Sequence, residues 1–234
     1  MDARVVHAAL RAVADPEKAA FYPNFFKTAP GQYGEGDRFI GVTVPKQRKI
    51  AKEFKDLPLV HIEKLLQSEV HEDRFAALAI LVLQFKSADE AGQNKVAQFY
   101  LSHRARVNNW DLVDASASYI LGPWLEHEDR KIIYDLAASK VLWDRRIAIL
   151  TAGYYIRNHD FIDIFALTDL LMNDSEDLMH KAIGWMLREV GKKDRKALEK
   201  FLKTRYKKMP RTMLRYAIEK FEPEVRQKYL GGLI

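Results

Sequence analysis

Apolar residues return at steps of three and four along almost the whole chain, which is the periodicity of an amphipathic α-helix. Alternating strand-like runs are absent, and proline or glycine residues separate one apolar segment from the next. These two features predict an all-α fold. The apolar helical segments are 57–66, 75–85, 96–101, 132–136, 147–156, 161–171 and 183–190.

The helical segments repeat with a period of about 35 residues. Arg74, Trp110, Arg146, Lys181 and Arg215 follow one another at spacings of 36, 36, 35 and 34 residues. A second helix precedes each of them at nearly the same period. Such a helix pair cannot bury its apolar face alone, so neighbouring pairs must stack. A short HEAT-like repeat fits this length better than a tetratricopeptide repeat, whose tryptophan–leucine–glycine–tyrosine pattern is not legible.

We therefore expect an α-α superhelical solenoid of HEAT-like helix pairs with a concave basic groove. Residues 1–234 would form a single HEAT-like repeat domain of about six helical pairs. One irregular connection interrupts the pattern near 28–44, where Gly31, Gly34 and Gly36 stand close together. Because no strand precedes these glycines, they predict a turn-rich connection rather than a phosphate-binding loop.

The composition excludes several classes of site. The chain has no cysteine, so disulfides, thiolate zinc sites and a cysteine nucleophile are ruled out. The seven histidines lack metal-ligand spacing, and the run from His71 to Phe75 is not an H-E-x-x-H motif. We expect neither a metal nor a cofactor. No apolar run is long enough to span a membrane, and the first 25 residues lack the apolar centre of a signal peptide. A cytoplasmic protein is expected.

The charge is unevenly distributed along the chain. Residues 181–234 contain 16 Lys and Arg against 6 Asp and Glu, a balance of +10, whereas residues 1–180 contain 22 against 26, a balance of −4. The basic third suggests a polyanionic partner. A solvated surface of lysine-rich helices would have the same composition, so charge alone leaves both interpretations open.

The repeat register predicts which side chains share one wall of the solenoid. A residue and the one four positions later lie on the same helix face, and Asp114 and Trp185 stand four positions after Trp110 and Lys181. Cations, two indoles and one carboxylate do not make a core, and this composition suits a groove for nucleic acid. The predicted stripe comprises Trp110, Asp114, Arg146, Lys181 and Trp185, extended by Arg211 and Arg215.

A purely structural interpretation competes for each of these residues. Trp110 and Trp185 would pack between repeats, and Asn109 would cap the helix that follows it. Asp114 lies in the second turn, where aspartate is a mediocre helix former. If it lies inside the stripe it needs a partner or a function, and a structural ion pair with Arg146 is the alternative to catalysis.

Five blocks of the sequence resemble the AlkD-type DNA alkylation repair glycosylases, a family built from HEAT-like repeats. They span about residues 20–230, and the most specific are NNWDLVD, the arginine of RRIAIL and KAIGW. The matching blocks are FFKTAPGQYGEGDRFIGVTVP (25–45), NNWDLVD (108–114), LWDRRIAIL (142–150), HKAIGWMLREVGK (180–192) and MPRTMLRYAIEKF (209–221).

The resemblance implies roles for the stripe. It assigns the lesion site to Trp110, Asp114 and Trp185, and it places Arg146 on a backbone phosphate. Family members hydrolyse the N-glycosidic bond of cationic bases such as N3-methyladenine and N7-methylguanine in duplex DNA, without flipping the base into a pocket. An N-terminal aromatic residue also contacts the substrate in some members, and the candidates are Tyr22, Phe25 and Phe26. Lys181, Arg211 and Arg215 would bind neighbouring phosphates.

The chemistry of this reaction agrees with a single carboxylate. A cationic base departs as a neutral molecule, so no general acid is needed, whereas ordinary glycosidases use two carboxylates. Asp114 alone can stabilise the oxocarbenium-like sugar and orient the attacking water. We expect a monomer whose partner is double-stranded DNA containing alkylated bases. The alternatives are a non-catalytic protein that binds duplex or damaged DNA, and a scaffold for protein interactions.

Overall fold

The apolar segments fold as helices. The computed structural model describes residues 2–234, and these residues form fifteen α-helices and two short 3₁₀ helices. Within this range no strand forms, apart from an isolated parallel bridge between Arg38 and Val70. The fold class is thus all-α, as predicted, and is consistent with an α-α superhelical solenoid.

The chain divides into two compact units, one up to Trp124 and one from Leu125 onward. The prediction of a single repeat domain stays a prediction. The first unit contains α1 (Ala3–Ala12), α2 (Pro16–Phe25), α3 (Val44–Glu53), α4 (Leu59–Leu66), α5 (His71–Ser87), α6 (Glu90–Ser102), a 3₁₀ turn (Arg104–Arg106), α7 (Trp110–Asp114) and α8 (Ala117–Trp124). The second contains α9 (Lys131–Ala137), α10 (Leu142–Ala152), a 3₁₀ turn (Tyr155–Asn158), α11 (Ile162–Leu171), α12 (Asp177–Lys193), α13 (Arg195–Lys203), α14 (Arg211–Ala217) and α15 (Pro223–Gly231).

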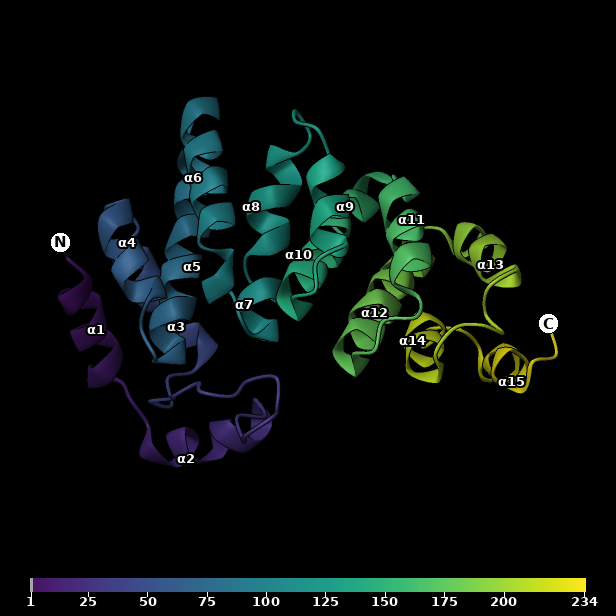
Figure 1. The fold of residues 1–234 in the computed structure, drawn as a ribbon, viewed down its shortest axis with the longest axis horizontal. Coiled ribbons are helices and arrows are strands. Elements are labelled where there is room, and N and C mark those ends of the chain that lie inside the picture. The colour runs from purple at the N-terminus through teal and green to yellow at the C-terminus, as the bar shows by residue number, and fades with distance from the viewer. Residues whose placement is uncertain (1) are drawn as a thin grey trace. The chain divides into compact units, whose positions relative to one another are not determined.

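The first unit is organised around α5, a helix of 17 residues. It packs against α3, α4, α6, α7 and α8, and its apolar positions face neighbours on several sides, as expected of a helix buried within a core. The predicted irregular connection lies between α2 and α3. Figure 1 shows this connection and α2 lying together beside one end of α3, α5 and α7.

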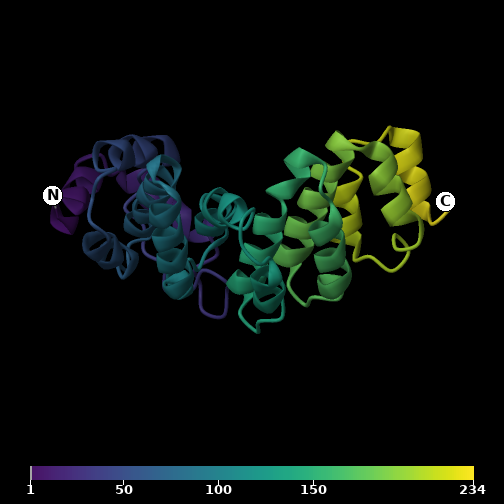
Figure 2. The same ribbon diagram turned by 90° about the horizontal axis from the view of Figure 1, so that it is seen from above.

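The second unit is organised in the same way around α12, which also has 17 residues and packs against α10, α11, α13 and α14. Figure 2 shows this unit coloured from teal-green at its start to yellow at the C-terminus. The contact between α12 and α14 is especially close. A Cβ built on Gly184 would lie 2.5 Å from the carbonyl oxygen of Met213 and 2.6 Å from Cβ of Tyr216, so only glycine permits this approach.

A short polar motif fixes the start of α5. The hydroxyl of Ser68 donates to Asp73 (2.7 Å) and accepts from the backbone N–H of Val70 (3.1 Å). Arg74 Nη1 then donates to the carbonyl of Ser68 (3.0 Å). These bonds provide partners for polar groups at the helix start, which the helix itself leaves unpaired.

The same motif begins α10 in the second unit. Ser139 Oγ donates to Asp144 (2.8 Å) and accepts from the N–H of Val141 (3.1 Å), and Arg145 Nη1 donates to the carbonyl of Ser139 (3.1 Å). Arg74 therefore corresponds to Arg145. The register drawn from sequence spacing, which pairs Arg74 with Arg146, was wrong by one residue.

The helix starts correct the register at Trp110 as well. Trp110 is the first residue of α7, whereas Asp114 is the fifth, like Arg146 in α10, Lys181 in α12 and Arg215 in α14. The predicted register was wrong here by one turn, because connections of unequal length make the spacing between helix starts uneven. First, fifth and ninth residues share a helix face, so Trp110 and Asp114 still lie on one face of their helix.

Candidate active site and nucleic-acid interface

The first turn of α7 holds the residues singled out in the sequence. Asn109 is its N-cap, and its side-chain oxygen accepts from the backbone N–H of Trp110 (2.8 Å). Asp111 follows in the first turn, where the helix dipole favours an acid. Trp110 and Asp114 are both half-buried. The cap therefore fixes where α7 begins and, with it, where the indole and the carboxylate point.

Aromatic rings hold the indole of Trp110 on the side of α2. The ring of Phe26 stacks on it with centroids 5.3 Å apart and planes at 16°, and Phe25 meets it edge-on at 5.8 Å. Phe26 is buried, whereas Phe25 is 51% exposed. Tyr22 reaches Phe26 and Phe39 and has no ring contact with Trp110. Of the three N-terminal candidates, Phe25 is thus the one that contacts Trp110 and is exposed.

The stack continues away from Trp110 to a buried histidine. Phe26 stacks on Phe39 at 4.8 Å, and Phe39 stacks on His71 at 4.7 Å. These rings and their neighbours, among them Tyr22, Val42 and Gln47, line a cavity of about 210 Å³. Trp110 thus belongs to a continuous aromatic assembly that joins α2, the connection before α3, α5 and α7.

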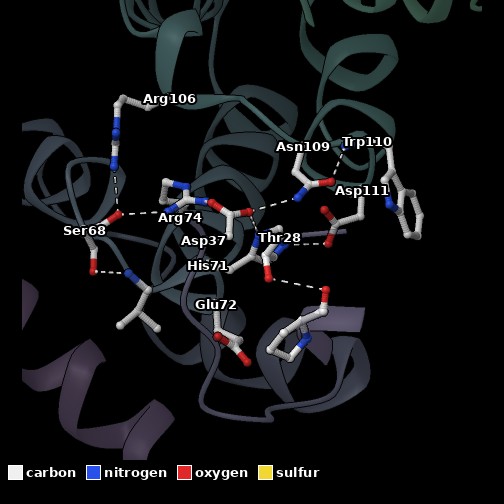
Figure 3. Close-up of polar contacts among 12 residues, drawn as sticks. Thr28, Asp37, Ser68, His71, Glu72, Arg74, Arg106, Asn109, Trp110 and Asp111 are labelled. Carbon is white, nitrogen blue, oxygen red and sulfur yellow. Dashed lines mark hydrogen bonds and ion pairs between the residues drawn. The ribbon is translucent and has the colours of Figure 1, made fainter. Parts of the chain in front are cut away.

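His71 lies between two carboxylates (Figure 3). Its Nδ1 is 2.9 Å from Asp37 and its Nε2 is 2.8 Å from Asp111, with only 2% of the side chain exposed. Burial alone would lower the pKa of His71, but the charges and hydrogen bonds of Asp111 and Asp37 outweigh it and raise the pKa to about 9. The ring is therefore an imidazolium at neutral pH and donates from both nitrogens.

Asp37 is the centre of this network. Besides His71, it accepts from Arg74 and from the side-chain amide of Asn109 (2.9 Å). Burial raises the pKa of Asp37, but these partners outweigh it, so the pKa of Asp37 is lowered. Two cations and two carboxylates, His71, Arg74, Asp37 and Asp111, thus balance one another in the interior, as buried charges must.

The network and the ring stack beside it hold three consecutive residues, the N-cap of α7 and its first two helical residues. Asn109 is held by Asp37, Trp110 by the ring of Phe26, and Asp111 by His71. Each bond comes from an element far away in sequence. The start of α7 is therefore over-determined, which is what a preorganised site requires.

Glu72 secures the connection that supplies Asp37. It is fully buried, and its carboxylate accepts backbone N–H groups of Ile40 (3.1 Å), Gly41 (2.8 Å) and Val42 (3.2 Å). Burial raises the pKa of Glu72, and the backbone hydrogen bonds oppose this shift. Gly41 has φ +83 and a Cβ there would lie 2.0 Å from the carbonyl of Asp15, so the connection needs glycine at this point.

The sequence interpretation did not foresee this network. His71, Asp37 and Asn109 were not among the predicted site residues, although a signal was present. Four consecutive ionisable residues, 71–74, stand directly before a continuous apolar run. In a helix that is apolar on all sides these side chains have no exposed face, and all four are indeed buried. Buried charges need partners, so the run marks a polar centre.

In the second unit, Arg146 lies on α10 and is 5% exposed. Its Nη1 donates to the carbonyl of Leu178 (3.1 Å), just inside the start of α12. Arg146 therefore links α10 to α12.

Lys181 and Trp185 are the fifth and ninth residues of α12, and Arg211 and Arg215 are the first and fifth of α14. Lys181 pairs with Asp177 at 2.7 Å across one helix turn, and this bond lowers the pKa of Asp177. Trp185 is half-buried, and both arginines are exposed. Since α12 packs on α14, the second unit carries these three cations on two adjacent helices.

Two classes of site receive no support from the described residues. Between residues 2 and 234, no group of three or more histidine, aspartate and glutamate side chains is placed to hold a metal ion. In the same range, no helix is both long enough and apolar enough to cross a bilayer.

Comparisons with known proteins agree with the fold and identify the family. The family model for DNA alkylation repair enzymes matches residues 6–221, so the chain belongs to the DNA alkylation repair enzyme family. A solved structure described as a predicted DNA alkylation repair enzyme from Enterococcus faecalis superposes with a TM-score of 0.71 at 19% identity. The alignment covers 90% of this chain and 97% of that one, so the two share a fold. None of the curated proteins matches the sequence.

Family membership gives the coarse function. The chain has a role in the repair of alkylated DNA, DNA is its partner, and the family is one of enzymes.

Proposed function

We propose that this protein is an AlkD-type DNA glycosylase, built from HEAT-like repeats, that hydrolyses the N-glycosidic bond of cationic alkylated purines in duplex DNA. The observation that carries the proposal is the shared face of Trp110 and Asp114 on α7. An indole and a carboxylate on one half-buried face suit a deoxyribose that gains positive charge. The buried network around His71 supports it further, because it fixes the start of α7.

In the proposed reaction, water attacks C1′ of the deoxyribose while the bond to the alkylated base breaks. The electron pair of that bond neutralises the cationic base, so the base leaves without being protonated. Asp114 orients the water, stabilises the oxocarbenium-like sugar and accepts the proton that the water loses. One carboxylate is sufficient for these tasks, since the leaving group is already activated.

The two indoles would stabilise the sugar cation through their π faces. Such contacts contribute about 0.5–2 kcal/mol each, which makes Trp110 and Trp185 rate-enhancing rather than indispensable. Trp110 is prepared for this role because Phe26 stacks on its other side. Phe25, half-exposed beside Trp110, is the N-terminal aromatic residue to which we assign the DNA contact.

The cations of the second unit would bind the DNA backbone. We assign Arg146 to a phosphate next to the lesion, and Lys181, Arg211 and Arg215 to neighbouring phosphates. Phosphate contacts fix the register of a protein on duplex DNA but carry no sequence information. Recognition through the backbone would let the enzyme act without flipping the base. We propose that it works as a monomer, on chromosomal DNA in the cytoplasm.

The test is release of free base from a duplex containing N7-methylguanine, measured under single-turnover conditions with saturating protein. Asp114→Asn should keep DNA binding and lose at least about 10²-fold in rate, the cost of removing one preorganised electrostatic group. Asp56→Asn, which neutralises an exposed carboxylate in the turn after α3, is the matched control and should retain the wild-type rate.

Two outcomes would overturn the proposal. If the wild-type protein binds duplex DNA but releases no base, it is a non-catalytic binder of DNA. If Asp114→Asn is as active as the wild type, the reaction does not depend on this carboxylate and the mechanism is wrong.

A further inference from the structure

A second cavity of the first unit lies directly beside α7. It has a volume of about 210 Å³ and is formed by α3, α5 and the junction between α7 and α8. Ala115, the residue after Asp114, lines one wall, and Phe75 of α5 lies in the apolar floor. We call it the α3 cleft. The α3 cleft thus reaches the residue that follows Asp114 in the chain.

The charge of the α3 cleft is entirely positive. Arg48 and Lys52 are the only formally charged side chains in its lining, and no carboxylate is present there. They are four residues apart on α3, so they project from the same helix face. A pair of cations with no acid in the same lining is an arrangement that attracts an anion.

Arg48 and Lys52 also differ from the cations of this protein that are held in ion pairs. Both are exposed, and within residues 2–234 no hydrogen bond or ion pair engages either side chain. By contrast, Lys181 pairs with Asp177, Arg188 with Glu219 and Arg195 with Glu222. The charges of the α3 cleft are thus available to a ligand at no cost in broken ion pairs.

The wall opposite α3 adds an aromatic hydroxyl. Tyr119 of α8 is 52% exposed although it lines the cleft. Tyrosine hydroxyls, like arginine and lysine, are common donors to DNA phosphates. Arg48, Lys52 and Tyr119 therefore offer three donors above an apolar floor, which suits a phosphate–sugar backbone better than an isolated inorganic ion.

We propose that the α3 cleft binds the phosphate backbone of duplex DNA, with Arg48 and Lys52 neutralising one phosphate each. This surface lies outside the basic C-terminal third, to which the charge of the sequence points. The inference rests on the proposed function in one respect, namely that the ligand is double-stranded DNA. In this proposal, α3 is the element of the first unit that binds the DNA backbone.

The test is the salt dependence of binding to an undamaged, fluorescently labelled duplex, measured by anisotropy between about 50 and 200 mM salt. Each neutralised phosphate contributes about 0.9 to the slope of log affinity against log salt. Arg48→Ala combined with Lys52→Ala should therefore reduce the slope by about 1.8 and weaken binding.

The matched control removes two exposed lysines from other helices of the same unit, Lys64→Ala on α4 and Lys95→Ala on α6. It changes the net charge by the same amount, but its slope should stay within about 0.5 of the wild-type value. If the slope of the control falls as far as that of the α3 variant, the loss reflects only the change in net charge, and the proposal is overturned. An unchanged slope in the α3 variant would also overturn it. That is the result expected if the cleft binds a protein segment instead of DNA.

Failure of this proposal is distinguishable from failure of the catalytic one. If the wild type releases no base but the α3 variant loses the expected slope, the cleft binds DNA and the glycosylase proposal is wrong. If base is released normally and the slope does not change, only the α3 cleft is wrong. Circular dichroism and thermal unfolding of the variant verify that its fold is intact.

Discussion

The starts of α5 and α10 use the same serine–valine–aspartate–arginine motif but continue it differently. In the second unit, Arg145 donates both to the Ser139 carbonyl and to Asp174, which lies just before α12. The first helical residue of α10 is Leu142. In the first unit the equivalent arginine, Arg74, reaches Asp37, and the first helical residue is His71.

This difference separates a structural joint from a prepared site. A leucine at the first helical position needs no partner, whereas a buried histidine recruits Asp37 and Asp111 and, through them, Asn109. The same backbone start thus serves only packing in α10, while in α5 it organises the beginning of α7. We infer that preorganisation of the site belongs to the first unit.

The largest effect is expected from making α5 resemble α10. His71→Leu removes one cation of a buried ion network, which leaves Asp111 without its cationic partner and Asp37 with Arg74 as its only cation. Breaking a buried pair in this way costs about 3–5 kcal/mol, measured as the free energy of unfolding in urea. The matched control is His103→Leu. It removes a histidine whose partner, Glu63, is largely exposed at 3.3 Å, and should cost no more than about 1 kcal/mol. Equal losses in the two variants would contradict the distinction between the units.

The next effect is the pH dependence of stability. The pKa of His71 is about 9 in the folded protein against about 6.5 when unfolded, so the stabilisation is complete below pH 6.5. It is lost progressively as the pH rises from 6.5 to 9, by about 3 kcal/mol in all. Urea unfolding of the wild type at several pH values should show this slope, and His71→Gln should flatten it. A wild-type stability that is level over this interval would mean that His71 is neutral.

A smaller effect is expected in the second unit. Arg145 donates to both oxygens of Asp174 at 2.6 and 3.2 Å, and Asp174 is almost buried. Asp174→Asn keeps the shape and one acceptor, so it should cost about 1.5–3 kcal/mol, the range for a charge-assisted hydrogen bond. The loss should be the same at pH 6.5 and at pH 9, because the two side chains in contact, Arg145 and Asp174, do not include a histidine. A pH-dependent loss would show that the two starts behave alike after all.

The positions of the helices could be predicted from the sequence better than the register in which one repeat matches the next. The apolar segments 75–85 and 183–190 lie within the two central helices, because each of these helices is packed into the core of its unit. Asn109 was also predicted correctly as a cap. The position of Trp110 within the repeat was not, because connection lengths vary from one helix pair to the next and spacing alone does not register them.

The buried network could not be derived from local patterns. Asp37 lies 34 residues from His71 and 72 from Asn109, and it stands in an irregular connection whose path no periodicity describes. Asp111 illustrates the same limit. Its place in a first turn accounts for it locally, while the structure gives it a partner on α5. Contacts between distant elements depend on the packed fold, so a single sequence does not reveal which charges meet.

The ring stack that supports Trp110 gives the site a spectroscopic signature. Phe26 lies face to face with Trp110 on one side and Phe39 on the other, with planes at 16° and 20°. Aromatic ring currents from both neighbours shield its protons, so the NMR signals of Phe26 should be displaced well upfield. A phenylalanine ring that is packed on both faces also flips slowly about its Cβ–Cγ axis. The sharpness of a single phenylalanine resonance would thus report, before any DNA is added, how firmly the indole beside it is held.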